Sequence, residues 1–326
     1  MKKNLVFISL VFIFFSCEKE ELPISPVDRN NLITRQIQIG LGNDYPYQVF
    51  YKLSEDLIVS QNLNEEWDLG FKSDDEGRHI ILNSSLASAV AFANISSFYE
   101  EPILSELEWR WDNPNGLLDS TAIGNYSVKE NIYVIDRGYI YGNPNVRYKK
   151  MIIDTVTNNF YKIHYASLDN SNEMIIQLDK NKQLNFTAFS FSTNSVVEIQ
   201  PNKEEWDLMF TRYTELFYQI TPPPYLVTGV LINNLNSIQV AIDTINDFNN
   251  IEINFDSNGN TNYIFSSEQN IIGYNWKVWN GTGYIIKPNL TYVIKDSYSR
   301  YFKLRFIDFY NDLGEKGFPT FEVQEL

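Results

Sequence analysis

The sequence predicts an all-β protein of antiparallel strands in a β-sandwich-like fold, with few or no helices. Aromatic residues make up 15% of the 326 positions, and such residues are favoured in strands. Short segments alternate apolar and polar side chains; one is the run from Tyr301 to Phe306. This alternation is typical of half-buried strands. Turn sequences such as Asp74–Gly77 and Asn113–Gly116 separate the segments, and no long segment has helical periodicity.

The chain also contains an internal repeat. Residues 50–71 align without gaps onto residues 189–210, at an offset of 139, with 8 of 22 positions identical. The block Glu65–Leu69 recurs as Glu204–Leu208. Three further blocks follow in the same order in each half: 109–111 with 276–279, 133–136 with 292–296, and 161–165 with 302–306. The collinear order predicts a duplicated fold, with an N-terminal degenerate β repeat at 36–185 and a C-terminal β domain at 186–326.

The N-terminus has the features of an export signal. Lys2 and Lys3 precede an apolar run, Leu5–Phe15, that is too short to span a bilayer but suits a signal peptide. Cys17 is the only cysteine, and its context resembles a bacterial lipobox. Lys19 followed by Glu20 and Glu21, just after this cysteine, resembles the surface-export signal of Bacteroidetes lipoproteins. We therefore expect a signal peptide at 1–16, a lipidated tether at 17–35, and an outer-membrane, surface-exposed protein held in the membrane by acyl chains on Cys17.

Charge and motif content exclude several functions. The net charge of −15 argues against nucleic-acid binding and against electrostatic binding to an anionic membrane. One cysteine allows no intrachain disulfide and no cysteine-based zinc site. The sequence contains no glycine-rich phosphate loop, no nucleophile elbow and no paired-histidine zinc motif. We therefore predict no catalytic residues and expect that the protein is not an enzyme.

Five residues are candidates for ligand binding. Trp109 and Trp111 are two positions apart and would share a strand face, and Trp276 is their repeat counterpart. Their rings could stack on a ligand, although an inter-sheet core is the alternative explanation. Tyr225 follows the stiff proline loop at 221–224, which could border a cleft. His79 follows a turn and is the least improbable metal ligand, the alternative being a surface histidine.

The second half resembles the HmuY family of Bacteroidetes lipoproteins. The ordered blocks that carry the resemblance are 205–213, 224–231, 292–306 and 314–322. The resemblance implies an all-β outer-membrane lipoprotein that binds haem beside a TonB-dependent receptor. It also implies two axial haem ligands, His or Met, from the region after the Trp-Asp-Leu motif.

This chain departs from the family pattern at the haem ligands. Residues 211–291 contain no His, Met or Cys. His164 lies on the Lys162 face of an alternating segment and is expected to face solvent. We therefore predict no haem binding by paired His or Met ligation from the second half, although tyrosine ligation stays open and the cofactor is left unassigned. The functional hypotheses are a ligand-capturing, uptake-associated lipoprotein or, alternatively, a non-haem β scaffold that binds a glycan or a protein at the cell surface.

Overall fold

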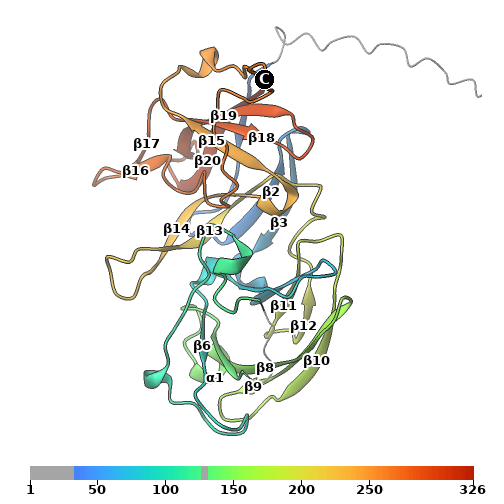
Figure 1. Ribbon diagram of the computed structural model, residues 1–326. Coiled ribbons are helices and arrows are strands. Elements are labelled where there is room, and N and C mark those ends of the chain that lie inside the picture. Colours follow the sequence, from blue (N-terminus) through green and yellow to red (C-terminus); the bar gives the residue numbers. More distant parts are fainter. Residues whose placement is uncertain (1–32, 126–130) are drawn as a thin grey trace, which may run out of the picture. The chain divides into compact units, whose positions relative to one another are not determined.

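A computed structural model describes residues 33–125 and 131–326, which form one compact unit from Ile33 onward (Figure 1). The predicted signal peptide, Cys17 and most of the tether lie outside the described residues. The all-β prediction is confirmed, because the described chain is organised in antiparallel sheets. Its one α-helix is the single turn α1, Pro144–Arg147. No described helix is long and apolar enough to cross a membrane.

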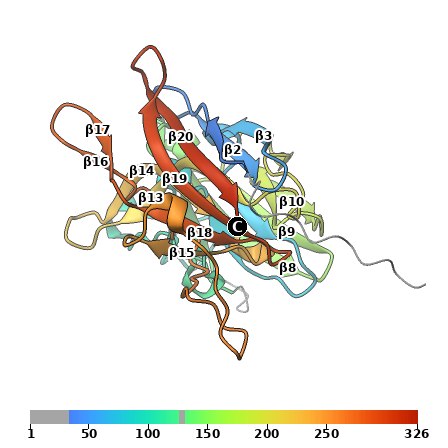
Figure 2. The ribbon, with the colours of Figure 1, turned by 90° about the horizontal axis from the view of Figure 1, so that it is seen from above.

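Two of the sheets are built mainly from the second half of the chain. A five-stranded sheet has the order β1 (Arg35–Gln38), β20 (Lys316–Glu325), β19 (Tyr301–Tyr310), β18 (Thr291–Lys295), β15 (Gln239–Asp243). A four-stranded sheet has the order β14 (Pro224–Ile232), β13 (Leu208–Leu216), β2 (Tyr47–Lys52), β3 (Leu57–Leu63). A separate hairpin pairs β16 (Lys277–Trp279) with β17 (Tyr284–Ile286). Figure 2 shows β18, β19 and β20 beside one another.

The other two large sheets are built from the first half and the middle of the chain. A five-stranded sheet has the order β10 (Met174–Asp179), β9 (Phe160–Ser167), β8 (Tyr148–Val156), β7 (Tyr133–Asp136), β6 (Ala89–Phe92). A four-stranded sheet has the order β12 (Ser195–Val197), β11 (Phe186–Ser190), β4 (Leu69–Lys72), β5 (Ile80–Leu82). Short 3₁₀ turns connect strands in both halves: η2 (Asn64–Glu66), η3 (Ser84–Leu86), η4 (Leu104–Glu106), η5 (Leu118–Ser120), η6 (Asn234–Asn236) and η7 (Phe248–Asn250).

The two repeats exchange a hairpin. At the offset of 139, hairpin β2–β3 corresponds to β11–β12, and β4 corresponds to β13. Strand β2 pairs with β13, with Tyr51 opposite Leu208, whereas β11 pairs with β4, with Ala188 opposite Gly70. Each hairpin therefore completes the four-stranded sheet of the other repeat. Figure 1 shows β2 and β3, in blue, beside β13 and β14.

Because of this exchange, the strands that pair with one another do not all come from the same repeat. Strands β4 to β12, within residues 64–200, pair among themselves. Strands β1 to β3, within residues 33–63, pair with one another or with strands that follow residue 200: β2 pairs with β3 and β13, and β1 pairs with β20. Hydrogen bonding thus crosses the division between residues 185 and 186 that the sequence repeat predicts.

Each four-stranded sheet packs on a five-stranded sheet to form a core. One core contains Tyr51 and Phe210 from the four-stranded sheet and Tyr292, Leu304 and Phe321 from the five-stranded sheet. The equivalent core of the other pair of sheets combines residues of β4, β5 and β11 with residues of β7, β8 and β9: Leu69, Phe71, Ile80, Leu82, Phe189, Tyr133, Ile135, Met151, Ile153, Tyr161, Ile163 and Tyr165. The fold is a pair of β-sandwiches, as the alternation predicts.

One predicted equivalence between the repeats is wrong by one strand. Strand β19 lies beside β18, which is the counterpart of β7, so its structural counterpart is β8. The sequence alignment instead matches residues 302–306 of β19 with residues 161–165 of β9. Neighbouring antiparallel strands carry the same alternation of aromatic and basic residues, so the pattern alone does not separate them.

Candidate functional site

A ligand-sized groove lies beside the separate hairpin β16–β17 and is here called the aromatic groove. Its volume is about 810 Å³, within the range of sites that hold drug-sized ligands. Strands β13, β14, β16 and β17 line it together with loop residues, and the residues that matter below are Arg212, Tyr225, Thr228, Tyr274, Lys277, Trp279, Tyr284 and Lys287. The groove therefore combines residues from separate segments of the chain, most of them in the second half.

Exposed aromatic rings are the main feature of this groove. Tyr225 is 57% exposed, and its ring contacts Phe217 edge-on at a centroid distance of 5.8 Å. Trp279 is 56% exposed and contacts Tyr284 edge-on at 5.3 Å. These contacts fix the rings while leaving faces open to a ligand. Aromatic faces held in this way can stack on a flat ring system.

The groove also carries positive charge in an acidic protein. Arg212 and Lys287 both line the groove, and Asp44 is the one acidic residue among its described lining residues. The whole chain, in contrast, has a net charge of −15. The Arg212 Nε donates to the Ser85 carbonyl at 2.9 Å, which fixes the guanidinium. A ligand with acidic groups would find a favourable local potential here.

Lys277 is a third basic residue of the groove, and it is buried. Its Nζ donates to the Thr228 carbonyl and lies 4.2 Å from the Trp276 ring centroid and 4.6 Å from that of Phe309. No carboxylate forms an ion pair with it in the described part of the chain. Burial without a counter-ion lowers the pKa of Lys277 to about 7.

The structure separates the predicted tryptophans from this groove. Trp276 is buried in the core and stacks on Phe306 at a centroid distance of 3.9 Å. Trp109 and Trp111 are partly buried, and Trp109 packs against Tyr148 at 5.9 Å. Only Tyr225 of the five predicted ligand-binding residues lines the groove.

His79 lies in the other sandwich. Both ring nitrogens are buried without a hydrogen bond, and the nearest carboxylate is Asp119, 3.7 Å from Nε2. His79 does not line the aromatic groove. Within residues 33–125 and 131–326, no cluster of three or more His, Cys, Asp and Glu side chains could hold a metal ion.

His164 is covered, contrary to the expectation that it faces solvent. Its side chain is 14% exposed, and its Nε2 lies 2.7 Å from the Glu173 carboxylate. Its ring packs on Phe98 at a centroid distance of 4.0 Å. The loop that contains Phe98 covers the face of β9 that the alternation assigned to solvent, and a periodic pattern carries no information about such a loop.

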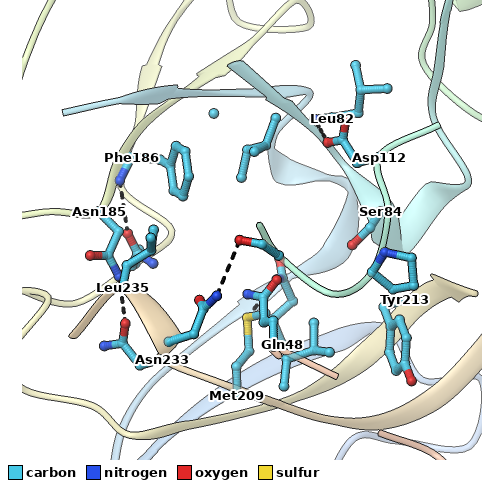
Figure 3. Close-up of a pocket in the computed structure, with 18 of the residues that line it drawn as sticks. Gln48, Leu82, Ser84, Asp112, Asn185, Phe186, Met209, Tyr213, Asn233 and Leu235 are labelled. Atoms are coloured by element: carbon cyan, nitrogen blue, oxygen red, sulfur yellow. Dashed lines mark hydrogen bonds between the residues drawn. The ribbon is translucent and has the colours of Figure 1, made fainter. Parts of the chain in front are cut away.

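A second hollow, here called the junction cavity, lies where the two repeats meet. It has a volume of about 120 Å³, and its walls include Trp67 and Gly70 from the first repeat and Trp206 and Met209 from the second. Figure 3 shows Asn185 and Phe186 on one side and Leu82, Ser84 and Asp112 on the other. Sequence reasoning missed this cavity.

The recurrence of a tryptophan at positions 67 and 206 is the one sequence feature that points to the junction cavity. Trp67 and Trp206 stand two residues before Leu69 and Leu208 in the repeated block, so the alternation of a strand would place each tryptophan on the same face as its leucine. The leucines enter two different cores, whereas both tryptophans line the junction cavity. Strand β4 begins only at Leu69, so Trp67 precedes the regular alternation that places side chains on a sheet face.

Residues 181–323 match a family model described as HmuY protein, which confirms the HmuY resemblance of the second half. No curated protein matches the chain.

Three solved structures show distant similarity. Apo PinO from Porphyromonas gingivitis is 10% identical, with 90% of this chain and 97% of that chain covered and a TM-score of 0.34. The apo HmuY analog of Tannerella forsythia is 11% identical, with 91% and 98% covered and a TM-score of 0.26. A putative HmuY-like heme-binding protein from Bacteroides vulgatus is 20% identical, with 41% and 81% covered and a TM-score of 0.22.

Proposed function

We propose that the protein captures a flat, anionic ligand in the aromatic groove and that it does not catalyse a reaction. The observation that carries the proposal is the coincidence of exposed rings and cations in one groove of about 810 Å³. Tyr225 and Trp279 supply stacking faces, and Arg212 and Lys287 supply positive charge. Haem, the ligand associated with the HmuY family, is a flat macrocycle with acidic side groups and fits this description.

The proposed binding mode relies on stacking and charge. The groove contains no His, Met or Cys, so the usual paired axial ligands are missing from its lining. Tyrosines line it, and a phenolate oxygen can hold haem iron. Because stacking and charge supply most of the proposed contact, we expect metal-free protoporphyrin IX to bind almost as well as haemin, and a strong preference for haemin would indicate tyrosine ligation instead.

Titration with haemin and with protoporphyrin IX tests this proposal. Tyr225→Ala and Trp279→Ala should each weaken binding of both compounds about tenfold, since each removes a stacking face. Tyr298→Ala is the matched control, because Tyr298 is 65% exposed but does not line the groove. A sharp low-spin spectrum that is lost in His79→Ala would contradict the proposal and would indicate histidine ligation in the other sandwich.

A charge variant separates a porphyrin from the alternative ligand, a neutral glycan. Both compounds would use the Tyr225 and Trp279 faces, but only the anionic ligand would gain from the exposed Lys287. Lys287→Gln should weaken porphyrin binding at low salt, and the difference from wild type should shrink at high salt. A groove that binds a neutral oligosaccharide, with no response to Lys287→Gln, would favour the glycan-binding scaffold.

We further propose that the protein is held at the outer membrane by acyl chains on Cys17, exposed at the cell surface, and works beside a TonB-dependent receptor. The support is the basic and apolar segment before Cys17 and the acidic run after it. Cys17→Ala should move the protein from the membrane fraction to the soluble fraction. Protease treatment of intact cells tests surface exposure, and co-purification with a receptor from solubilised membranes tests the partner.

A further inference from the structure

Aromatic side chains from both repeats enclose the junction cavity. Phe50, Trp67, Phe186 and Trp206 all line it, and the Phe50 ring contacts the Trp206 ring edge-on at a centroid distance of 5.0 Å. Phe50 and Phe186 belong to the exchanged hairpins, so the cavity is a product of the exchange. Such walls favour an aromatic occupant.

Hydrogen bonding within the cavity wall leaves one strong donor unused. Trp67 Nε1 donates to Gln48 Oε1 at 2.9 Å, and Asn185 Nδ2 donates to Asn233 Oδ1 at 2.8 Å. The equivalent tryptophan, Trp206, is only 2% exposed, and its Nε1 has no acceptor in the described part of the chain. Buried N–H groups are nearly always bonded, so an acceptor atom that reached this one would complete a missing hydrogen bond.

A second donor in the wall is weakly used. Gln48 Nε2 donates to the Met209 sulfur at 3.3 Å, and a thioether is a weak acceptor. Met209 stands where the first repeat has Gly70, so only one side of the cavity carries this flexible side chain. An oxygen atom would be a better acceptor than the sulfur for this amide.

The charge of the wall excludes ionic ligands. Asp112 is the one charged residue among those described as lining the cavity. Its carboxylate oxygens accept backbone N–H groups from Leu82 and Ala122, each at 2.7 Å. An anion would find no cation here, and a cation would compete with these bonds for the one carboxylate.

We propose that the junction cavity is a second ligand site, which takes a small neutral aromatic molecule with one hydrogen-bond-accepting oxygen. Trp206 Nε1 donates to that oxygen, and the aromatic walls contact the ring. A volume of about 120 Å³ suits a single ring, since an apolar cavity of about 150 Å³ binds benzene. The site is too small for a porphyrin, so this inference does not depend on the ligand of the aromatic groove.

Calorimetric titration of the folded protein with phenol and with benzene tests the proposal. Wild type should bind both, with phenol at least fivefold tighter because its oxygen accepts from Trp206. Trp206→Phe should remove most of this preference. Trp67→Phe is the matched control and should retain the preference, because the Trp67 N–H is already bonded to Gln48.

A cavity-filling variant locates the binding. Ala188 lines the cavity opposite Gly70 on the neighbouring strand, so Ala188→Leu should weaken phenol and benzene binding at least tenfold and leave protoporphyrin binding unchanged. Ala188→Val gives the same test with less added volume if the leucine variant does not fold. Absence of saturable phenol binding to wild type, or phenol binding that neither filled variant reduces, would overturn the proposal.

Discussion

Asp68 and Asp207 occupy equivalent positions in the two repeats, and each accepts a backbone N–H from the other repeat. Asp207 Oδ2 accepts from Leu53 at 2.9 Å, and Asp68 Oδ2 accepts from Phe191 at 2.7 Å. Each carboxylate also has a buried cation: Lys52 lies 2.9 Å from Asp207, and Arg137 lies 2.8 Å from Asp68. The two repeated aspartates therefore hold the exchanged hairpins in place.

Removing the cation from one of these pairs should strongly destabilise the protein. Lys52→Met leaves the fully buried Asp207 carboxylate without its cation, and we expect the free energy of unfolding to fall by about 3–5 kcal/mol. Lys182→Met is the control, because Lys182 and its partner Asp75 are both more than half exposed. That pair should contribute less than about 1 kcal/mol. Guanidinium unfolding measures both, and equal losses would contradict the structural role of Asp207.

The hairpin exchange also predicts which fragment folds alone. Residues 64–200 contain every strand of one sandwich, β4 to β12, whereas residues 36–185 lack β11 and β12 and carry β2 and β3 without their partner β13. We expect fragment 64–200 to unfold cooperatively and fragment 36–185 to show no cooperative transition. Circular dichroism during thermal unfolding distinguishes them. Cooperative unfolding of 36–185 alone would contradict the exchange.

The sequence could predict the strands but not their partners. The Glu-Glu-Trp-Asp-Leu repeat and the alternation of aromatic residues are local signals, and both correctly indicated a duplicated β fold. A hairpin keeps the same sequence whether it pairs with its own repeat or with the other one. Asp207 therefore looks like a motif residue in the sequence, and only the structure shows that Lys52 and Leu53 are its partners.

The candidate groove was only partly predictable for a related reason. Tyr225 was indicated by its place after the proline loop, and it lines the groove. Arg212, Lys277 and Trp279 come from other segments, and nothing local in the sequence places them together. Trp276 illustrates the converse: it was selected as an aromatic candidate, but large aromatic residues also build cores, and this one stacks on Phe306.

The two repeated tryptophans should respond differently to the same substitution. Trp67→Phe breaks the bond from Nε1 to Gln48, whereas Trp206→Phe removes an N–H that has no acceptor in the described chain. We expect Trp67→Phe to reduce stability by about 1 kcal/mol more than Trp206→Phe. Replacing either with Ala should cost about 3–5 kcal/mol, because both side chains are buried. Urea unfolding of the four variants measures these differences, and a larger loss for Trp206→Phe would be the contrary result.

Lys277 should make the protein more stable as the pH rises from about 7 to about 10. A lysine paired with a carboxylate has the opposite effect. Burial lowers its pKa to about 7 in the folded state, whereas an unfolded lysine has a pKa of about 10.4. Between these values the unfolded chain binds more protons at this residue, so its contribution to stability rises with pH from about 7 to about 10, with a slope of at most about 1.4 kcal/mol per pH unit. Stacking of the ammonium on Trp276 and Phe309 favours the charged form, which narrows the pH range over which stability rises. Lys277→Met should flatten this dependence, whereas Lys162→Met, at a side chain that is 45% exposed, should leave it unchanged. Guanidinium unfolding between pH 7 and pH 9.5 measures the slope, and a slope in Lys277→Met equal to that of wild type would show that Lys277 is not a buried, unpaired amine.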